Sequence, residues 1–160
     1  MLVEVEVSSF AVDPARNTPV IILKEVSGKR MLPVPIGPLE ASAIAIESLK
    51  VTPDKPLTID LGRIIMEQLG GTLKRVIISD IIENSLHAKI QISKGNGSMV
   101  MIECRPCDAL ALAMRCKAPL YALDFLFEKI QAGNSLSDEE KLRKHISSID
   151  TLDFGHYILE

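Results

Sequence analysis

The stretch Ser85-Leu86-His87-Ala88-Lys89-Ile90-Gln91-Ile92-Ser93 decides the fold class, because it carries the most regular alternation of apolar and polar residues in the chain. Leucine, alanine and isoleucine fall on one side, and histidine, lysine and glutamine fall on the other, which predicts a strand with one buried face. A strand is expected before it, over 73–79, and another after the glycine-containing turn 94–97, over 98–103. The three segments predict consecutive antiparallel hairpins.

A second group of strands is predicted at the N-terminus. Val3, Val5 and Val7 alternate with polar residues within 2–12, and turn residues then lead into strands over 18–25 and 30–36. Pro33 and Pro35 cannot donate hydrogen bonds to a neighbouring strand. The third strand is therefore expected at an edge of the sheet.

Helices are expected between and after the strands. A helix over 38–49 is apolar or small on nearly every face, which is typical of a helix covered on several sides. Further helices are expected over 58–69 with Thr58 as N-cap, over 106–117, after Asp124, and over about 137–148. This order predicts an α+β fold, a mixed or antiparallel β-sheet packed with helices. We expect a single domain over 1–132 and a short acidic helical tail over 133–160.

The composition is that of a globular chain with excess apolar surface. Hydrophobic residues make up 47% of the 160 residues, and the mean hydropathy is +0.22. This excess predicts a homo-oligomer, most simply a dimer. Neither a membrane span nor a basic, apolar leader is visible, so a cytoplasmic protein without membrane contact is expected.

The charge distribution gives no general attraction for nucleic acid. Up to Ile130 there are fifteen Lys and Arg against fifteen Asp and Glu, and the tail carries three against six. Aromatic residues make up 4% and tryptophan is absent, so binding of RNA or DNA would require a local site. No Gly-x-Ser-x-Gly, Walker or dinucleotide-binding motif is present, and no organic cofactor is expected.

The motif Cys104-Arg105-Pro106-Cys107 stands at a strand-to-helix junction. A C-x-x-C pair there is compatible with thiol redox chemistry, because a helix N-terminus lowers a thiol pKa. However, no βαβ pattern precedes it and no aromatic residue flanks the first cysteine. As zinc ligands the pair would need two more partners. Packing cysteines are favoured, and a thiol redox protein is the weakest of the alternatives.

Polar residues gather at the junctions between the expected strands and helices. Carboxylates meeting there could hold Mg²⁺ or Mn²⁺ for phosphodiester hydrolysis, since these ions prefer oxygen ligands. A structural interpretation stands beside this one: Glu40 and Asp60 suit helix first turns, and Arg105 and Asp108 are spaced for an intrahelical ion pair. The residues are Asn17, Glu40, Thr58, Asp60, Glu103, Arg105 and Asp108.

Four motifs follow one another along the chain. They are Asn17-Thr18-Pro19-Val20-Ile21-Ile22-Leu23; Leu32-Pro33-Val34 with Ile36-Gly37 and Glu40-Ala41; Lys55-Pro56-Leu57-Thr58-Ile59-Asp60-Leu61; and Arg105-Pro106 with Asp108-Ala109 and Ala118-Pro119-Leu120. Over about residues 3–130 this order resembles the bifunctional nuclease domain family. The resemblance implies a nuclease acting on both RNA and DNA. The family pattern usually has histidine where Ile59 stands, and serine where Cys104 and Cys107 stand.

These observations predict a metal-assisted nuclease without base specificity. Glu40, Asp60 and Asp108 are the expected metal ligands, and one of them is the expected general base. Arg105 is expected to bind a phosphate oxygen, so that Asp108, Arg105 and Asp60 form the catalytic group and Asn17, Thr58 and Arg105 contact the substrate. The main alternative is a non-catalytic oligomeric binding or regulatory module, favoured by the neutral charge and the missing histidine.

Overall fold

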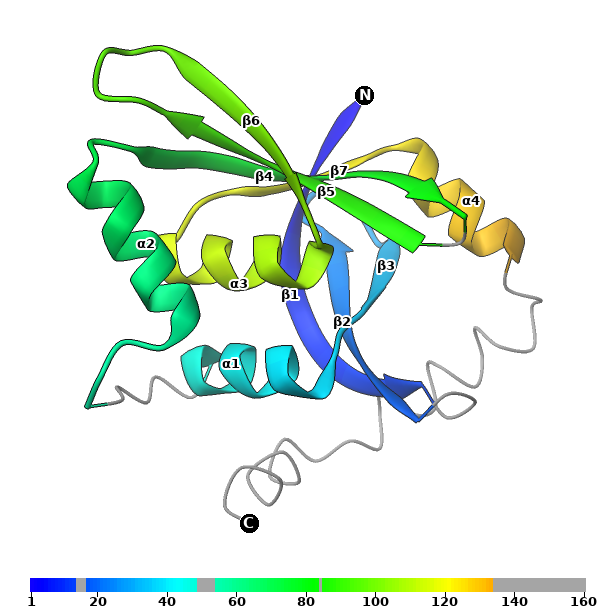
Figure 1. The fold of residues 1–160 in the computed structure, drawn as a ribbon. Helices are drawn as coiled ribbons and strands as arrows, with labels where there is room; N and C mark the ends of the chain where they lie inside the picture. The colour runs from blue at the N-terminus through cyan, green and yellow to red at the C-terminus, as the bar shows by residue number, and fades with distance from the viewer. Residues whose placement is uncertain (14–16, 49–53, 84, 134–160) are drawn as a thin grey trace.

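The computed structural model describes residues 1–13, 17–48, 54–83 and 85–133, and Figure 1 shows their arrangement. Within these ranges the chain forms seven strands and four helices. The strands are β1 (Leu2–Asp13), β2 (Thr18–Glu25), β3 (Met31–Pro35), β4 (Thr72–Ile82), β5 (Ser85–Ser93), β6 (Met99–Cys104) and β7 (Leu120–Leu123). The helices are α1 (Pro38–Ser48), α2 (Thr58–Gln68), α3 (Pro106–Cys116) and α4 (Phe125–Gly133). The expected helix over 137–148, with the tail that contains it, lies outside the described residues.

All seven strands belong to one mixed sheet in the order β3-β2-β1-β7-β4-β5-β6. The two hairpin groups predicted from the sequence form its two halves, and the short strand β7 joins them. β7 runs antiparallel to β1 and parallel to β4. The chain is therefore a single α+β domain with a mixed sheet, as predicted, and β3 with its two prolines lies at an edge.

Alternation along the strands sends one set of side chains into a common core. Ala88 and Ile90 of β5 are buried beside Val76 and Ile78 of β4, whereas Lys89 lies on the opposite face. Helix α3 covers this apolar face and also contacts α1 and α2 (Figure 1). Its alanines allow close packing, and Leu110 between them is fully buried.

Helix α1 buries one face and leaves its start exposed. Ala41, Ile44 and Ala45 are buried, as expected for a helix of the core. Leu39, however, is 84% exposed, so the expectation of cover on several sides is wrong at this end of the helix. The exposed leucine stands beside the cleft described below.

The start of α2 differs from the expectation as well. Leu57, not Thr58, is the N-cap residue, and its backbone N–H donates to Oδ2 of Asp60 at 3.0 Å. Asp60, at the third helical position, thus accepts from the backbone N–H of the N-cap residue, as the acidic residue of a capping box does.

None of the helices in the described part of the chain has the length and apolar character of a membrane span.

Candidate functional site

The site is built around Arg105, which connects β6 to α3. Arg105 is the N-cap residue of α3, in extended conformation, and Pro106 begins the helix after it. Because proline fixes the first helical turn, the direction in which Arg105 leaves the strand is well defined. Its side chain is 66% exposed and carries its guanidinium between two carboxylates.

The two carboxylates are those of Asp108 and Glu40. Arg105 donates from Nε to Oδ2 of Asp108 at 2.7 Å and from Nη2 to Oδ1 at 3.0 Å. Its Nη1 lies 3.0 Å from Oε1 of Glu40, which comes from the first turn of α1. These contacts raise the pKa of Arg105, with the hydrogen bonds to Asp108 as the largest cause, so the group stays cationic. The cluster therefore holds two carboxylates and one exposed cation at neighbouring helix starts.

Gly37 makes room for Glu40. A side-chain Cβ at this glycine would overlap Oε2 of Glu40. The absence of that Cβ lets the carboxylate turn back over the helix start toward Arg105. Gly37 thus leaves the space that this orientation of the Glu40 carboxylate occupies.

A cleft of about 530 Å³ opens beside the cluster, between α1, the start of α2 and the first turns of α3. Glu40 and Asp108 line it together with Thr58, Ser42 and Cys107. The remaining lining is apolar and consists of Leu39, Ile46, Leu57, Ile59 and Ala111. The cleft is large enough for a small organic group and has few polar atoms with which to distinguish one group from another.

Cys107 points its sulfur toward the same carboxylates. Its Sγ and one oxygen from each of Glu40 and Asp108 all lie within 4.8 Å of one another, although Cys107 itself is only 7% exposed. The sequence alone favours a packing role for this cysteine and suggests chemistry for it only as half of a C-x-x-C pair. Its position directly before Asp108 places its backbone near the site, but the direction of its side chain depends on how α3 packs.

The pKa values of the cysteines oppose the redox alternative. Burial, then the charge of Asp108, raises the pKa of Cys104 to about 11. Burial also raises the pKa of Cys107, and both thiols are free. A thiol redox centre needs a lowered pKa, because the thiolate is the reactive form. The motif therefore lacks the activation that its helix-start position suggested.

Asp60 lies apart from the cleft lining. Its Oδ1 is 3.0 Å from Nε of Arg115 on α3, and the two side chains are 13% and 11% exposed. With its second oxygen on the Leu57 N–H, Asp60 attaches the start of α2 to α3. The structure thus brings together Glu40, Arg105, Asp108 and Thr58 but places Asp60 in a supporting contact.

Asn17 and Glu103 also lie outside the cleft lining. Asn17 occupies the β1–β2 turn with φ of 50°, and its backbone N–H donates to Asp13 O at 2.7 Å. Asparagine tolerates this left-handed conformation better than most residues. Glu103 contacts Nδ1 of His87 at 2.9 Å across β5 and β6.

Comparison with known proteins shows which domain type contains the cluster. The profile of the bifunctional nuclease domain matches residues 21–134, a range that includes all the residues of the cleft and leaves Asn17 outside. An uncharacterised protein of Mycobacterium tuberculosis (strain ATCC 25618 / H37Rv) is 34% identical over 165 residues, covering 94% of this chain and 97% of the relative.

Two plant proteins are more distant relatives. Bifunctional nuclease 1 of Arabidopsis thaliana is 28% identical over 112 residues, covering 68% of this chain and 34% of the plant protein. Bifunctional nuclease 2 of the same plant is 25% identical over 138 residues, covering 84% and 41% respectively. The sequence resemblance and the match over 21–134 agree, and the chain belongs to the bifunctional nuclease domain family.

Proposed function

We propose that this protein hydrolyses phosphodiester bonds of RNA and DNA without base specificity, at the cluster formed by Glu40, Arg105 and Asp108. The observation that carries the proposal is that Arg105, at a strand end, contacts Glu40 and Asp108 at two helix starts, and that these two carboxylates line one cleft. The names of the plant relatives support the reaction class.

Arg105 is the phosphate-binding group. A guanidinium presents parallel N–H donors that match two oxygens of a phosphate, as they now match the two oxygens of Asp108. Since the side chain is 66% exposed, it can turn from the carboxylates to a substrate with little loss of packing.

Glu40 and Asp108 are the residues that would hold a divalent cation such as Mg²⁺ or Mn²⁺. Two carboxylates beside an open cleft fit such an ion, which usually keeps several water molecules and binds phosphate oxygens as well. When bound, the ion would stabilise charge on the phosphoryl oxygens and favour ionisation of water. Asp60, engaged with Arg115, keeps the α2 side of the cleft in place.

Asp108 is the group to which we assign proton transfer from the attacking water. Its side chain is 43% exposed against 22% for Glu40, so water reaches it more readily. A carboxylate has two oxygens, which allows one to accept a proton while the other is engaged.

The apolar lining explains why base specificity is not expected. Reading of a base requires hydrogen bonds to its edge, and the cleft offers mainly the hydroxyls of Ser42 and Thr58 besides the charged cluster. Contacts to the phosphate alone would give weak activity on any sequence.

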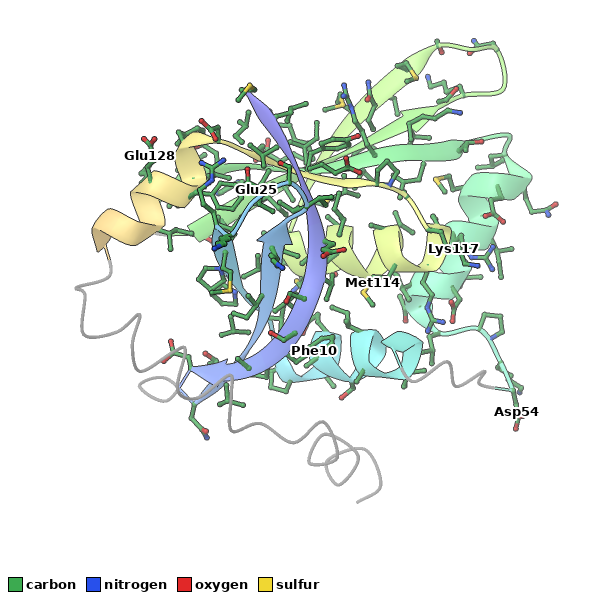
Figure 2. All side chains as sticks on the ribbon, turned by 180° about the vertical axis from the view of Figure 1, so that it is seen from behind. Phe10, Glu25, Asp54, Met114, Lys117 and Glu128 are labelled. Carbon is green, nitrogen blue, oxygen red and sulfur yellow. The ribbon has the colours of Figure 1, made fainter. Side chains whose placement is uncertain are left out.

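The test compares the wild-type protein with Asp108→Asn, Arg105→Ala and the control Glu128→Gln, on RNA and on single-stranded DNA. Figure 2 shows Glu128 on α4, at the opposite end of the molecule from α2. Each protein is assayed with Mg²⁺, Mn²⁺ or EDTA, and folding is checked by circular dichroism. We expect loss of hydrolysis in the two cluster variants and in EDTA, with the control unchanged. Equal hydrolysis in all four proteins, or activity that persists in EDTA, would contradict the proposal.

A non-catalytic binding module is the second candidate function. It is favoured by one observation: the single charge of Arg105 already pairs with both carboxylates, as in a structural ion-pair network. This candidate predicts RNA binding without hydrolysis in any of the metal conditions.

A further inference from the structure

The sulfur of Cys107 gives the acidic cluster a third ligand atom of different chemistry. It shares a 4.8 Å neighbourhood with oxygens of Glu40 and Asp108, and it also lines the cleft. Cys107 is more than nine-tenths buried, with only 7% of its surface exposed. A buried thiol directed toward two carboxylates at an open cleft is an arrangement that a packing role does not require.

The donor set matters because metal ions differ in the ligands they prefer. Mg²⁺ favours oxygen alone, whereas zinc and related first-row ions also bind thiolate sulfur. A catalytic zinc site typically has three protein ligands and keeps its fourth position open for water or substrate. Glu40, Cys107 and Asp108 supply three such ligands, and the cleft beside them leaves space for the fourth.

We propose that Glu40, Cys107 and Asp108 together bind a thiophilic divalent ion of the Zn²⁺ or Co²⁺ class in preference to Mg²⁺. The inference rests on the proposed function for the location of the site, and it replaces Mg²⁺ or Mn²⁺ by a thiophilic ion as the ion that binds there most tightly. Ligand atoms bound at about 2.0–2.3 Å lie within roughly 4 Å of one another, so small side-chain rotations bring the three together. Sulfur binds as thiolate, and its proton passes to solvent on binding.

Under this proposal, Arg105 exchanges its carboxylate partners for a phosphate when the ion binds. In this structure its guanidinium contacts both carboxylates, where it offsets their mutual repulsion. A divalent ion on these oxygens would repel the guanidinium, and an exposed side chain can move away from it. Ion binding would thus release Arg105 toward a phosphate in the cleft.

Absorption spectroscopy with Co²⁺ tests the proposal without depending on hydrolysis. A Co²⁺–thiolate bond gives a charge-transfer band in the near ultraviolet, whereas oxygen ligands alone do not. We expect this band in the wild-type protein and in the matched controls Cys104→Ser and Cys116→Ser. It should be absent in Cys107→Ser and strongly weakened in Glu40→Gln. Zn²⁺ should abolish the band, and a large excess of Mg²⁺ should not.

A band that is absent from the wild type, or present unchanged in Cys107→Ser, would overturn the proposal. Since Cys107 is buried, Cys107→Ala serves as a second variant if the serine variant fails to fold by circular dichroism. Hydrolysis in Mg²⁺ by a wild-type protein that shows no Co²⁺–thiolate band would overturn this inference while leaving the proposed nuclease intact. A Cys107-dependent band without hydrolysis in any metal would support the ion site and contradict the nuclease.

Discussion

Arg105 holds Asp108 with two near-parallel hydrogen bonds, from Nε to Oδ2 at 2.7 Å and from Nη2 to Oδ1 at 3.0 Å. The same guanidinium contacts Glu40 through its remaining nitrogen. One cation therefore links the starts of α1 and α3, and it does so while largely exposed. Exposed ion pairs contribute little to stability, which leaves these side chains free to exchange partners during binding.

The first prediction concerns the geometry of Arg105. Arg105→Lys keeps the positive charge but loses the paired donors that match a phosphate. Loss of a charge-assisted hydrogen bond of about 1.5–3 kcal/mol should lower kcat/KM for RNA about ten- to a hundredfold. Steady-state kinetics on one defined oligonucleotide measures this. A lysine variant with wild-type kinetics would show that charge alone is sufficient.

The second prediction concerns Gly37. Gly37→Ala should displace the carboxylate of Glu40, because the added Cβ overlaps Oε2. We expect weaker Co²⁺ binding, measured by absorption titration, although no ligand has been removed. Gly62→Ala on α2 is the matched control, since its Cβ meets nothing within 4 Å. The control should leave ion binding unchanged and raise stability by about 0.5–1 kcal/mol, as alanine favours a helix over glycine. Equal ion affinity in both variants would contradict the positioning role.

The third prediction separates Asp60 from the catalytic cluster. Asp60→Asn should lower the free energy of unfolding by about 2–4 kcal/mol, because it removes the charge facing Arg115 in a nearly buried pair. Urea unfolding at neutral pH measures the change. Glu67→Gln, in an exposed pair with Arg63 on the same helix, should change stability by less than about 0.5–1 kcal/mol. Hydrolysis lost in Asp60→Asn at full stability would instead make Asp60 part of the site.

The fourth prediction concerns the pH dependence of Cys104. Its pKa is raised from 9.0 to about 11, so at pH 8 its thiolate is about a hundredfold scarcer than for an unperturbed thiol. Alkylation of the native protein should be slow at pH 8 and accelerate toward pH 11. The native state also retains this proton more tightly than the unfolded chain. The contribution of this proton to the free energy of unfolding is present below about pH 9 and is lost as the pH rises toward about 11.

The alkylated positions are identified by peptide mass spectrometry, with the protein in denaturant as the reference for unhindered thiols. Rapid modification of Cys104 in the native state at pH 8 would contradict its raised pKa and restore the redox alternative.

The fifth prediction is the homodimer expected from the composition. Leu61 and Ile65 on α2 and Leu69, the C-cap residue of this helix, follow one another at helical spacing and are 50%, 50% and 82% exposed. Burial of such a stripe against a second copy would remove apolar surface from water. Ile65→Glu should shift sedimentation toward the monomer, while Val26→Glu, at an exposed position in the β2–β3 turn, should not. A wild-type monomer at micromolar concentration would contradict the prediction.

The sequence by itself determined the features that depend on neighbouring residues. Alternation over 85–93 specifies β5, because the period of a strand places every second side chain on the same face. Pro33 and Pro35 specify the edge position of β3, since they lack the donors that a central strand needs. The contact between Arg105 and Asp108 is also local, because the two residues are three positions apart on the chain. Their spacing predicted this ion pair, as the alternative to a catalytic role for the two residues.

Only the tertiary structure decided which distant residues meet. Glu40 reaches Arg105 because α1 and α3 pack side by side, and Asp60 faces Arg115 because α2 packs on α3. Glu40 and Asp60 both lie in the first turn of a helix, so the local sequence made them equally good candidates for the site. Helix packing placed one at the cleft and the other in a supporting ion pair. Helix packing also turned Cys107 toward the carboxylates. The rotation of α3 about its axis depends on contacts with distant residues, and local periodicity does not encode those contacts.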